Sequence, residues 1–210
     1  MDNVKTVLRE GSIALLALAY AFTIDATVVT YPAPSEARLN RSFSVEVRQS
    51  GTLEWQPVDI YAVKVDRTEG VKHSAATVSM AYFDFDGKVD VRVTSNEIPV
   101  KEASVRPLSY DIPIDIQGNS FTFSLDTPRN LSVEVNGEIF NNLQLFANPL
   151  DINRPSDKEL RKLKKDKKYY YYGPGYYNIG TLNLGSGETL YVAGGAVLDG
   201  DVQISGADGV

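Results

Sequence analysis

The stretch from Tyr169 to Leu198 reads YYYYGPGYYNIGTLNLGSGETLYVAGGAVL, and it decides the expected fold of the C-terminal part of the chain. Short apolar segments alternate here with turns that contain glycine, which adopts positive φ angles at little cost. The expected strands are 169–172, 181–184, 189–193, 196–198 and 202–204. A period of about 20 to 25 residues with glycine corners is typical of a solenoid, in which one coil stacks on the next.

A second sandwich with glycine-rich hairpins is the structural alternative for this region. It fits less well, because the expected strands are shorter than those that precede them. A single solenoid coil cannot bury its own apolar face, so several neighbouring coils are needed for stability. We therefore expect this region to be the start of an architecture that further coils would complete.

Residues 27–150 are predicted to form an antiparallel β-sandwich. Apolar and polar residues alternate with period 2, the pattern of strands that bury one face. The expected strands are 28–31, 43–48, 60–65, 77–85, 89–93, 104–108, 114–116, 121–125, 131–135 and 143–147. The positions expected to face the core are 89, 91, 93, 131, 133 and 135.

Three turn sequences indicate where neighbouring strands join. Asp86-Gly87 and Asn136-Gly137 are strong hairpin signals, because both residue types accept the positive φ angles of tight hairpin turns. Gln117-Gly118-Asn119 is expected to connect the strands on either side of it.

A charged segment, residues 151–168, joins the two regions. Only two of the residues from Asp157 to Lys168 are apolar, and many are lysines. Such a run could bind an anionic partner such as a uronate or a heparin-like glycan. A solvated, partly helical linker is the simpler interpretation, because charge runs are usually exposed connectors.

The composition excludes several classes of function. The net charge is −6, which argues against a nucleic acid as partner, since binding would require neutralised phosphates. Cysteine is absent, so disulfides, thiolate nucleophiles and zinc–cysteine sites are excluded. The sequence also contains no phosphate-binding glycine loop and no EF-hand spacing.

Residues 1–26 are predicted to be a signal peptide, which implies secretion to the extracellular space. Lys5 and Arg9 precede an apolar run at 12–22, and Ala19-Tyr20-Ala21 has the small–x–small pattern of a cleavage site. The run is shorter than the roughly 18 apolar residues of a membrane-spanning helix, so no membrane span is expected. A short amphipathic or buried first helix is the alternative.

Five short motifs occur in an order that resembles a known group of enzymes. They are FDF at 83–85, VRPL at 105–108, LFANP at 145–149, YGPG at 172–175 and TLYVAGGAV at 189–197. The order resembles the N-terminal part of secreted glycoside hydrolases, either polygalacturonase-like (family 28) or dextranase-like (family 49). Their pectin-lyase-like fold implies an all-β chain: an antiparallel β-sandwich followed by the first coils, truncated here, of a right-handed parallel β-helix. The resemblance covers residues 27–208.

The resemblance implies a polysaccharide substrate, no cofactor and no metal. These enzymes cut glycosidic bonds with inversion, using carboxylates about 6.5–9.5 Å apart so that a water molecule fits between them. In the families the catalytic aspartates lie several coils further along, so we expect no catalytic residue in this chain, an N-terminal fragment. The alternatives are a non-catalytic β-sandwich module that binds carbohydrate or protein, and a structural fragment without activity.

Aromatic residues are the candidates for carbohydrate contact, because a flat ring can stack on a sugar and a tyrosine hydroxyl can form hydrogen bonds. The candidates are Trp55, Tyr170, Tyr172 and Tyr176. For Tyr169–Tyr172 and the neighbouring tyrosines the simpler interpretation is a seam between the two regions. For Trp55 it is a partly buried residue at a strand end.

Other polar residues point to a site less strongly. Asp199 and Asp201, with Asp208 nearby, could form an acid–base pair, but aspartate beside glycine is typical of turns. His73 is the only histidine and lies in no motif. Asn40 and Asn130 begin N-glycosylation sequons, which matter only in a eukaryotic secretory pathway.

Overall fold

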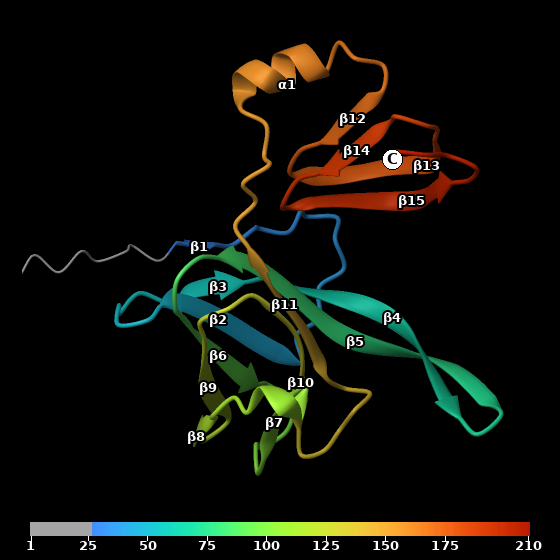
Figure 1. Cartoon of the computed structure of the whole chain (residues 1–210). Helices are drawn as coiled ribbons and strands as arrows, with labels where there is room; N and C mark the ends of the chain where they lie inside the picture. Colours follow the sequence, from blue (N-terminus) through green and yellow to red (C-terminus); the bar gives the residue numbers. More distant parts are fainter. Residues whose placement is uncertain (1–26) are drawn as a thin grey trace, which may run out of the picture.

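The structure is a computed structural model that describes residues 27–210. The predicted signal peptide, residues 1–26, lies outside the described residues. In Figure 1 a unit of two sheets lies in the lower half, and the helix α1 with strands β12–β15 lies above it. The described residues are mostly strands with one α-helix, so the prediction of an all-β chain is confirmed.

The first sheet of this two-sheet unit (residues 27–149) has six strands in the order β1-β5-β11-β10-β7, with β4 also paired to β5. All neighbours are antiparallel except β5 and β11. The strands are β1 (Val28–Val29), β4 (Ile60–Glu69), β5 (Lys72–Phe85), β7 (Ala103–Arg106), β10 (Arg129–Val135) and β11 (Leu143–Pro149).

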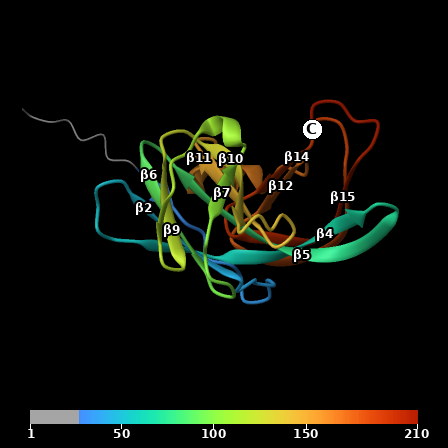
Figure 2. The ribbon, with the colours of Figure 1, turned by 90° about the horizontal axis from the view of Figure 1, so that it is seen from below.

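The second sheet has five antiparallel strands in the order β3-β2-β6-β9-β8. They are β2 (Phe43–Gln49), β3 (Gln56–Val58), β6 (Val89–Ser95), β8 (Asp115–Gln117) and β9 (Ser120–Leu125). A short 3-10 helix, η1 (Leu108–Tyr110), follows β7. The strand predicted at 104–108 therefore ends earlier, at Arg106, and Leu108 begins the 3-10 helix. Figure 2 shows β2, β6 and β9 on one side of the unit and β7, β10 and β11 on the other.

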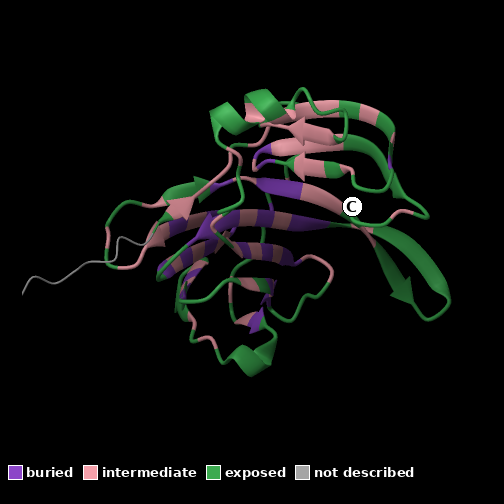
Figure 3. Cartoon of the chain, turned by 45° about the horizontal axis from the view of Figure 1, so that its top comes forward, coloured by how far each residue is buried: buried purple, intermediate pink, exposed green. Residues whose placement is uncertain are grey.

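The inward faces of the two sheets form one hydrophobic core. Alternate residues are buried along the strands, as the purple stripes in Figure 3 show. The six positions predicted to face the core are all buried: Val89, Val91, Val93, Leu131, Val133 and Val135. Period-2 patterning therefore gives the correct inward face for both sheets.

The hairpin predicted at Asp86-Gly87 is wrong. β5 belongs to the six-stranded sheet and β6 to the five-stranded sheet, so this turn carries the chain from one sheet to the other. Phe85 and Val89 are both buried and lie on opposite sides of the core, which is why the two strands face each other instead of pairing. Gly87 has the same positive φ, 78°, that a hairpin would need, so local turn chemistry does not distinguish the two outcomes.

The other two turns join paired strands as expected. β8 and β9 are antiparallel around residues 117–119. β10 and β11 are antiparallel on either side of a loop that starts with Asn136 and Gly137, whose φ angles are 54° and 74°.

Helix α1 (Asp157–Leu163) lies in the charged segment and contains no buried residue. It starts with a capping box, in which Ser156 Oγ accepts from the Glu159 backbone N–H and the Glu159 carboxylate accepts from the Ser156 backbone N–H. This local signal explains why an otherwise solvated connector is partly helical. Within residues 27–210, no helix has the length and apolar character required to cross a bilayer.

The C-terminal strands form two parallel pairs, which we call the stacked turns (residues 169–204). β12 (Tyr169–Tyr172) pairs with β14 (Thr189–Val192), and β13 (Gly175–Leu184) pairs with β15 (Ala196–Ile204). Paired residues such as Tyr169 and Thr189 are 20 positions apart, within the predicted repeat. Strands joined by hairpins would pair antiparallel, whereas these strands pair parallel. The alternative prediction of glycine-rich hairpins is therefore wrong.

Two details of this region differ from the sequence prediction. Segments 196–198 and 202–204, expected as separate strands, are parts of the single strand β15. Gly180 and Gly200 lie inside β13 and β15 at a register shift, not at corners. A Cβ atom on Gly200 would overlap the Gly180 carbonyl oxygen, so glycine here permits the close approach of two backbones.

The shared core predicts a large effect of truncating Leu145, which is 0% exposed. Leu145→Ala should lower the free energy of unfolding by about 2–5 kcal/mol, because it removes buried methyl groups and leaves a cavity. The matched control is Leu53→Ala, since Leu53 is 89% exposed and should change stability by less than about 0.5 kcal/mol. Urea denaturation measures both, and similar losses in the two variants would contradict this core.

The close approach at Gly200 makes a second prediction. Gly200→Ala should destabilise the stacked turns by about 3 kcal/mol or more, because the new methyl group has no room. Gly180→Ala is the matched control: φ there is also positive, at 57°, but open space surrounds the Cβ, so the cost should be about 1–2 kcal/mol. Urea denaturation followed by circular dichroism compares them, and equal costs would show that the backbones are not this close.

Candidate functional site

A large cleft lies between the two-sheet unit and the stacked turns. Its volume is about 820 Å³, within the range of about 300–1,000 Å³ typical of ligand pockets. β4, β5 and the segment before β2 line one side, and β13, β14 and β15 line the other. The lining side chains that carry polar groups include Tyr31, Glu36, Arg38, Tyr61, Tyr82, Asp84, Asn148, Asp151, Tyr176 and Asp199.

Three tyrosine rings form the floor of the cleft on the side of the two-sheet unit. Tyr82 lies between Tyr31 and Tyr61, with ring centroids 5.5 Å and 6.1 Å away and interplanar angles of 20° and 25°. Tyr82 is on the outward face of β5, because its neighbours Ala81 and Phe83 point into the core. The stack therefore covers the outer surface of the six-stranded sheet where the stacked turns approach it.

The turn between β14 and β15 contacts this stack directly. The Gly195 backbone N–H donates to the Tyr82 hydroxyl at 2.8 Å. A Cβ on Gly194 would overlap the Tyr31 ring, so a residue without a side chain is needed for the turn to approach this closely. We call this contact between the turn and the tyrosine stack the seam.

Three of the four carboxylates that line the cleft, those of Asp84, Asp151 and Asp199, accept a hydrogen bond from a tyrosine. Tyr31 donates to Asp84 at 2.6 Å, and Tyr176 donates to Asp199 at 2.6 Å. Tyr191 donates to Asp151, which follows β11. These contacts fix the orientation of both partners, so the cleft presents ordered acceptors beside flat aromatic faces.

The environment keeps these tyrosines protonated. Burial, followed by the hydrogen bond to Asp84, raises the pKa of Tyr31 well above its usual value. Burial and the neighbouring Tyr82 raise the pKa of Tyr61. The hydrogen bond to Asp199 raises the pKa of Tyr176. The neutral hydroxyls of Tyr31 and Tyr176 already donate to carboxylates, so they are suited to binding and orientation, not to proton abstraction near neutral pH.

The four aromatic residues predicted to contact carbohydrate lie in different parts of the structure. Tyr176 lines the cleft. Tyr170 donates to Glu188 at 3.3 Å, and Tyr172 packs edge-on against Tyr177 with centroids 5.1 Å apart, both within the stacked turns. Trp55 lies on the outer face of the five-stranded sheet, under the guanidinium groups of Arg48 and Arg92.

The remaining polar residues considered as site candidates do not form a common site. Asp199 and Asp201 lie within β15, so the prediction that they belong to a turn is wrong: strand pairing with β13 continues through Gly200. Asp208 lies beyond β15, and its backbone N–H donates to Ser186. His73 lies on the exposed β4–β5 hairpin, 2.7 Å from Asp66. Residues 27–210 contain no group of three or more histidine, aspartate or glutamate side chains that could hold a metal ion.

The two sequon asparagines lie in the two-sheet unit. Asn40 is half-buried, and its side-chain oxygen accepts from the backbone and hydroxyl of Ser42, the third residue of the sequon. Asn130 is exposed on β10.

Sequence reasoning missed the tyrosine stack. Tyr82 occupies the polar phase of an alternating strand, where an aromatic residue can indicate a second packed surface. Tyr31 and Tyr61 lie far from it in sequence, so only the strand pairing of β1 and β4 with β5 brings the three together.

No protein-family model matches the sequence, and comparison with curated proteins gives no match either. Among solved structures, the fold is similar to that of Dex49A from Penicillium minioluteum, with a TM-score of 0.59 and 16% sequence identity. The similarity covers 82% of this chain and 44% of Dex49A, so the chain spans less than half the length of that protein. At this identity the similarity concerns the fold alone.

The raised tyrosine pKa values predict a loss of stability in alkali. Folding favours the protonated forms of Tyr31 and Tyr61, so their contribution is complete below the usual tyrosine pKa of 10.0 and is lost as the pH rises above it. Urea denaturation between pH 8 and pH 11.5 should show the decline, and Tyr31→Phe should make it shallower. In a titration by absorbance near 295 nm, native tyrosines that ionise at the same pH as denatured ones would contradict this environment.

Proposed function

We propose that this chain is the N-terminal part of a polysaccharide-degrading glycoside hydrolase that acts with inversion, either dextranase-like or polygalacturonase-like. In this proposal the two-sheet unit is a β-sandwich, and the stacked turns are the first coils of a right-handed parallel β-helix. The catalytic coils lie outside this chain. In the proposal, residues 1–26 are a signal peptide that directs export of the enzyme to the polysaccharide.

The observation that carries the proposal is the order of the structural elements. A two-sheet unit, a charged connector and parallel turns with a 20-residue spacing follow one another in this chain. The sequence motifs resemble dextranase-like and polygalacturonase-like hydrolases with that order, and the fold is similar to that of Dex49A. Dextran is therefore the first substrate class to test, and polygalacturonate is the second.

The surface of the stacked turns supports their continuation. Val202 and Ile204 on β15 are exposed, and neither β14 nor β15 has a second neighbour among the described strands. A further coil would pair with these strands and cover the apolar side chains. In the proposal such coils supply the acid and the base, which must lie about 6.5–9.5 Å apart for inversion.

The cleft has a supporting role in this proposal. Its tyrosine stack holds the first coils against the two-sheet unit, as the hydrogen bond from the Gly195 backbone to Tyr82 indicates. We assign no catalytic residue to it, because each of its carboxylates already accepts a hydrogen bond, Asp84, Asp151 and Asp199 from a tyrosine and Glu36 from Ser35.

Reading the gene beyond the codon for Val210 and expressing the whole open reading frame tests the proposal. The longer product should appear in the culture medium and hydrolyse dextran or polygalacturonate, and NMR of the first product should show an inverted anomer. Residues 27–210 alone should be inactive on both. A stop codon directly after Val210, or a long product inactive on both polymers, would refute the proposal.

A further inference from the structure

A second cavity lies on the outer face of the five-stranded sheet, on the opposite side of the two-sheet unit from the cleft. Its volume is about 630 Å³, again within the range of about 300–1,000 Å³ for ligand pockets. Strands β2, β6 and β9 form its floor, and the segment around η1 and the start of β10 form its wall. We call it the groove.

Trp55 and Tyr110 are among the aromatic residues that line the groove, and each ring contacts at least one guanidinium group. The guanidinium carbons of Arg48 and Arg92 lie 4.4 Å and 4.2 Å from the centroid of the Trp55 ring. Arg129 lies 4.1 Å from the centroid of Tyr110, which is 39% exposed. Cation–π contacts hold both rings in place, so they are ordered before any ligand arrives.

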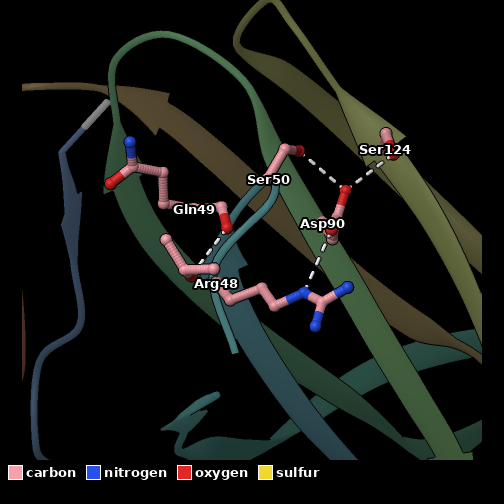
Figure 4. A network of polar contacts seen from close by, with 6 residues as sticks. Arg48, Gln49, Ser50, Asp90 and Ser124 are labelled. Carbon is pink, nitrogen blue, oxygen red and sulfur yellow. Dashed lines mark hydrogen bonds and ion pairs between the residues drawn. The ribbon is translucent and has the colours of Figure 1, made fainter. Parts of the chain in front are cut away.

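A hydrogen-bond network fixes the polar floor of the groove, as Figure 4 shows. Asp90 accepts from Ser50 at 2.7 Å, from Ser124 at 2.8 Å and from Arg48 Nε at 3.0 Å. Partial burial alone would raise the pKa of Asp90, but these hydrogen bonds outweigh it and lower the pKa below its usual value. The carboxylate therefore stays charged and keeps its three partners in place.

Arg48 connects the network to the aromatic wall. Its bond to Asp90 uses Nε, so the two terminal nitrogens keep donors for a further acceptor. A guanidinium stacked on an indole directs those donors outward along its edges, away from the ring face. The groove thus combines flat rings with in-plane donors, the features that recognise a sugar ring and its hydroxyl groups.

The charges of the groove indicate which saccharide it takes. Arg48, Lys88 and Arg129 contribute three positive charges, and the lining also contains the four carboxylates of Asp90, Asp111, Asp115 and Asp126. This balance gives a uronate no electrostatic advantage, whereas neutral hydroxyls can both donate to carboxylates and accept from the cations. We propose that the groove binds a neutral oligosaccharide, at a site independent of the proposed hydrolase activity.

The single tryptophan makes this binding directly measurable, because Trp55 is the only one in the chain. Neutral gluco-tetrasaccharides with α-1,6, α-1,4 or β-1,4 linkages are titrated into the chain, and tryptophan fluorescence is recorded. At least one should give a saturable change, whereas tetragalacturonate should bind at least tenfold more weakly. No saturable change with any neutral tetrasaccharide, or tighter binding of tetragalacturonate, would overturn the proposal.

Two tyrosine variants locate the site. Tyr110→Ala removes an exposed ring of the groove, and it should weaken binding by about tenfold while circular dichroism shows an unchanged fold. Tyr176→Ala is the matched control, because Tyr176 lines the cleft on the other side of the molecule, and it should leave binding unchanged. Loss of binding in Tyr176→Ala but not in Tyr110→Ala would assign the saccharide to the cleft and refute the groove.

Discussion

The contact of Gly194 and Gly195 with Tyr31 and Tyr82 is the interaction on which the arrangement of the chain depends. The stacked turns contain few buried side chains, and a solenoid coil cannot bury its own apolar face. They therefore need a surface to rest on, and the outer face of the six-stranded sheet provides it. The Gly195–Tyr82 hydrogen bond and the absence of a side chain at Gly194 allow the turn to approach the tyrosine rings closely.

The two-sheet unit can present a functional surface on each of its two outer faces, because its core is formed entirely by the inward faces of its own two sheets. With the inward faces of both sheets fully used in one core, each outward face is free to carry polar and aromatic side chains. The face of β5 carries the tyrosine stack that receives the stacked turns. The face of β2 and β6 carries Trp55 and the Asp90 network. One core thus positions the start of the proposed β-helix and, on the other side, the proposed saccharide groove.

Sequence patterns predicted the features that depend on neighbours along the chain. Burial of Val89 or Leu131 follows from alternation, and the parallel repeat follows from glycine spacing. The patterns failed where the outcome depends on distant partners. Asp86-Gly87 has hairpin chemistry but joins two sheets, and Tyr82 meets its ring partners only through strand pairing. Nothing local to Trp55 indicated that two arginines from β2 and β6 would hold its ring.

Amide hydrogen exchange of Gly194→Ala tests most directly whether the two-sheet unit holds the stacked turns. Gly194 has no positive φ angle, so alanine changes only the space available beside the Tyr31 ring. If the seam holds the stacked turns, the variant should exchange faster throughout residues 169–204 and at an unchanged rate in β2 and β6. Unchanged exchange in residues 169–204 would contradict this role, because the stacked turns would then be stable without the seam.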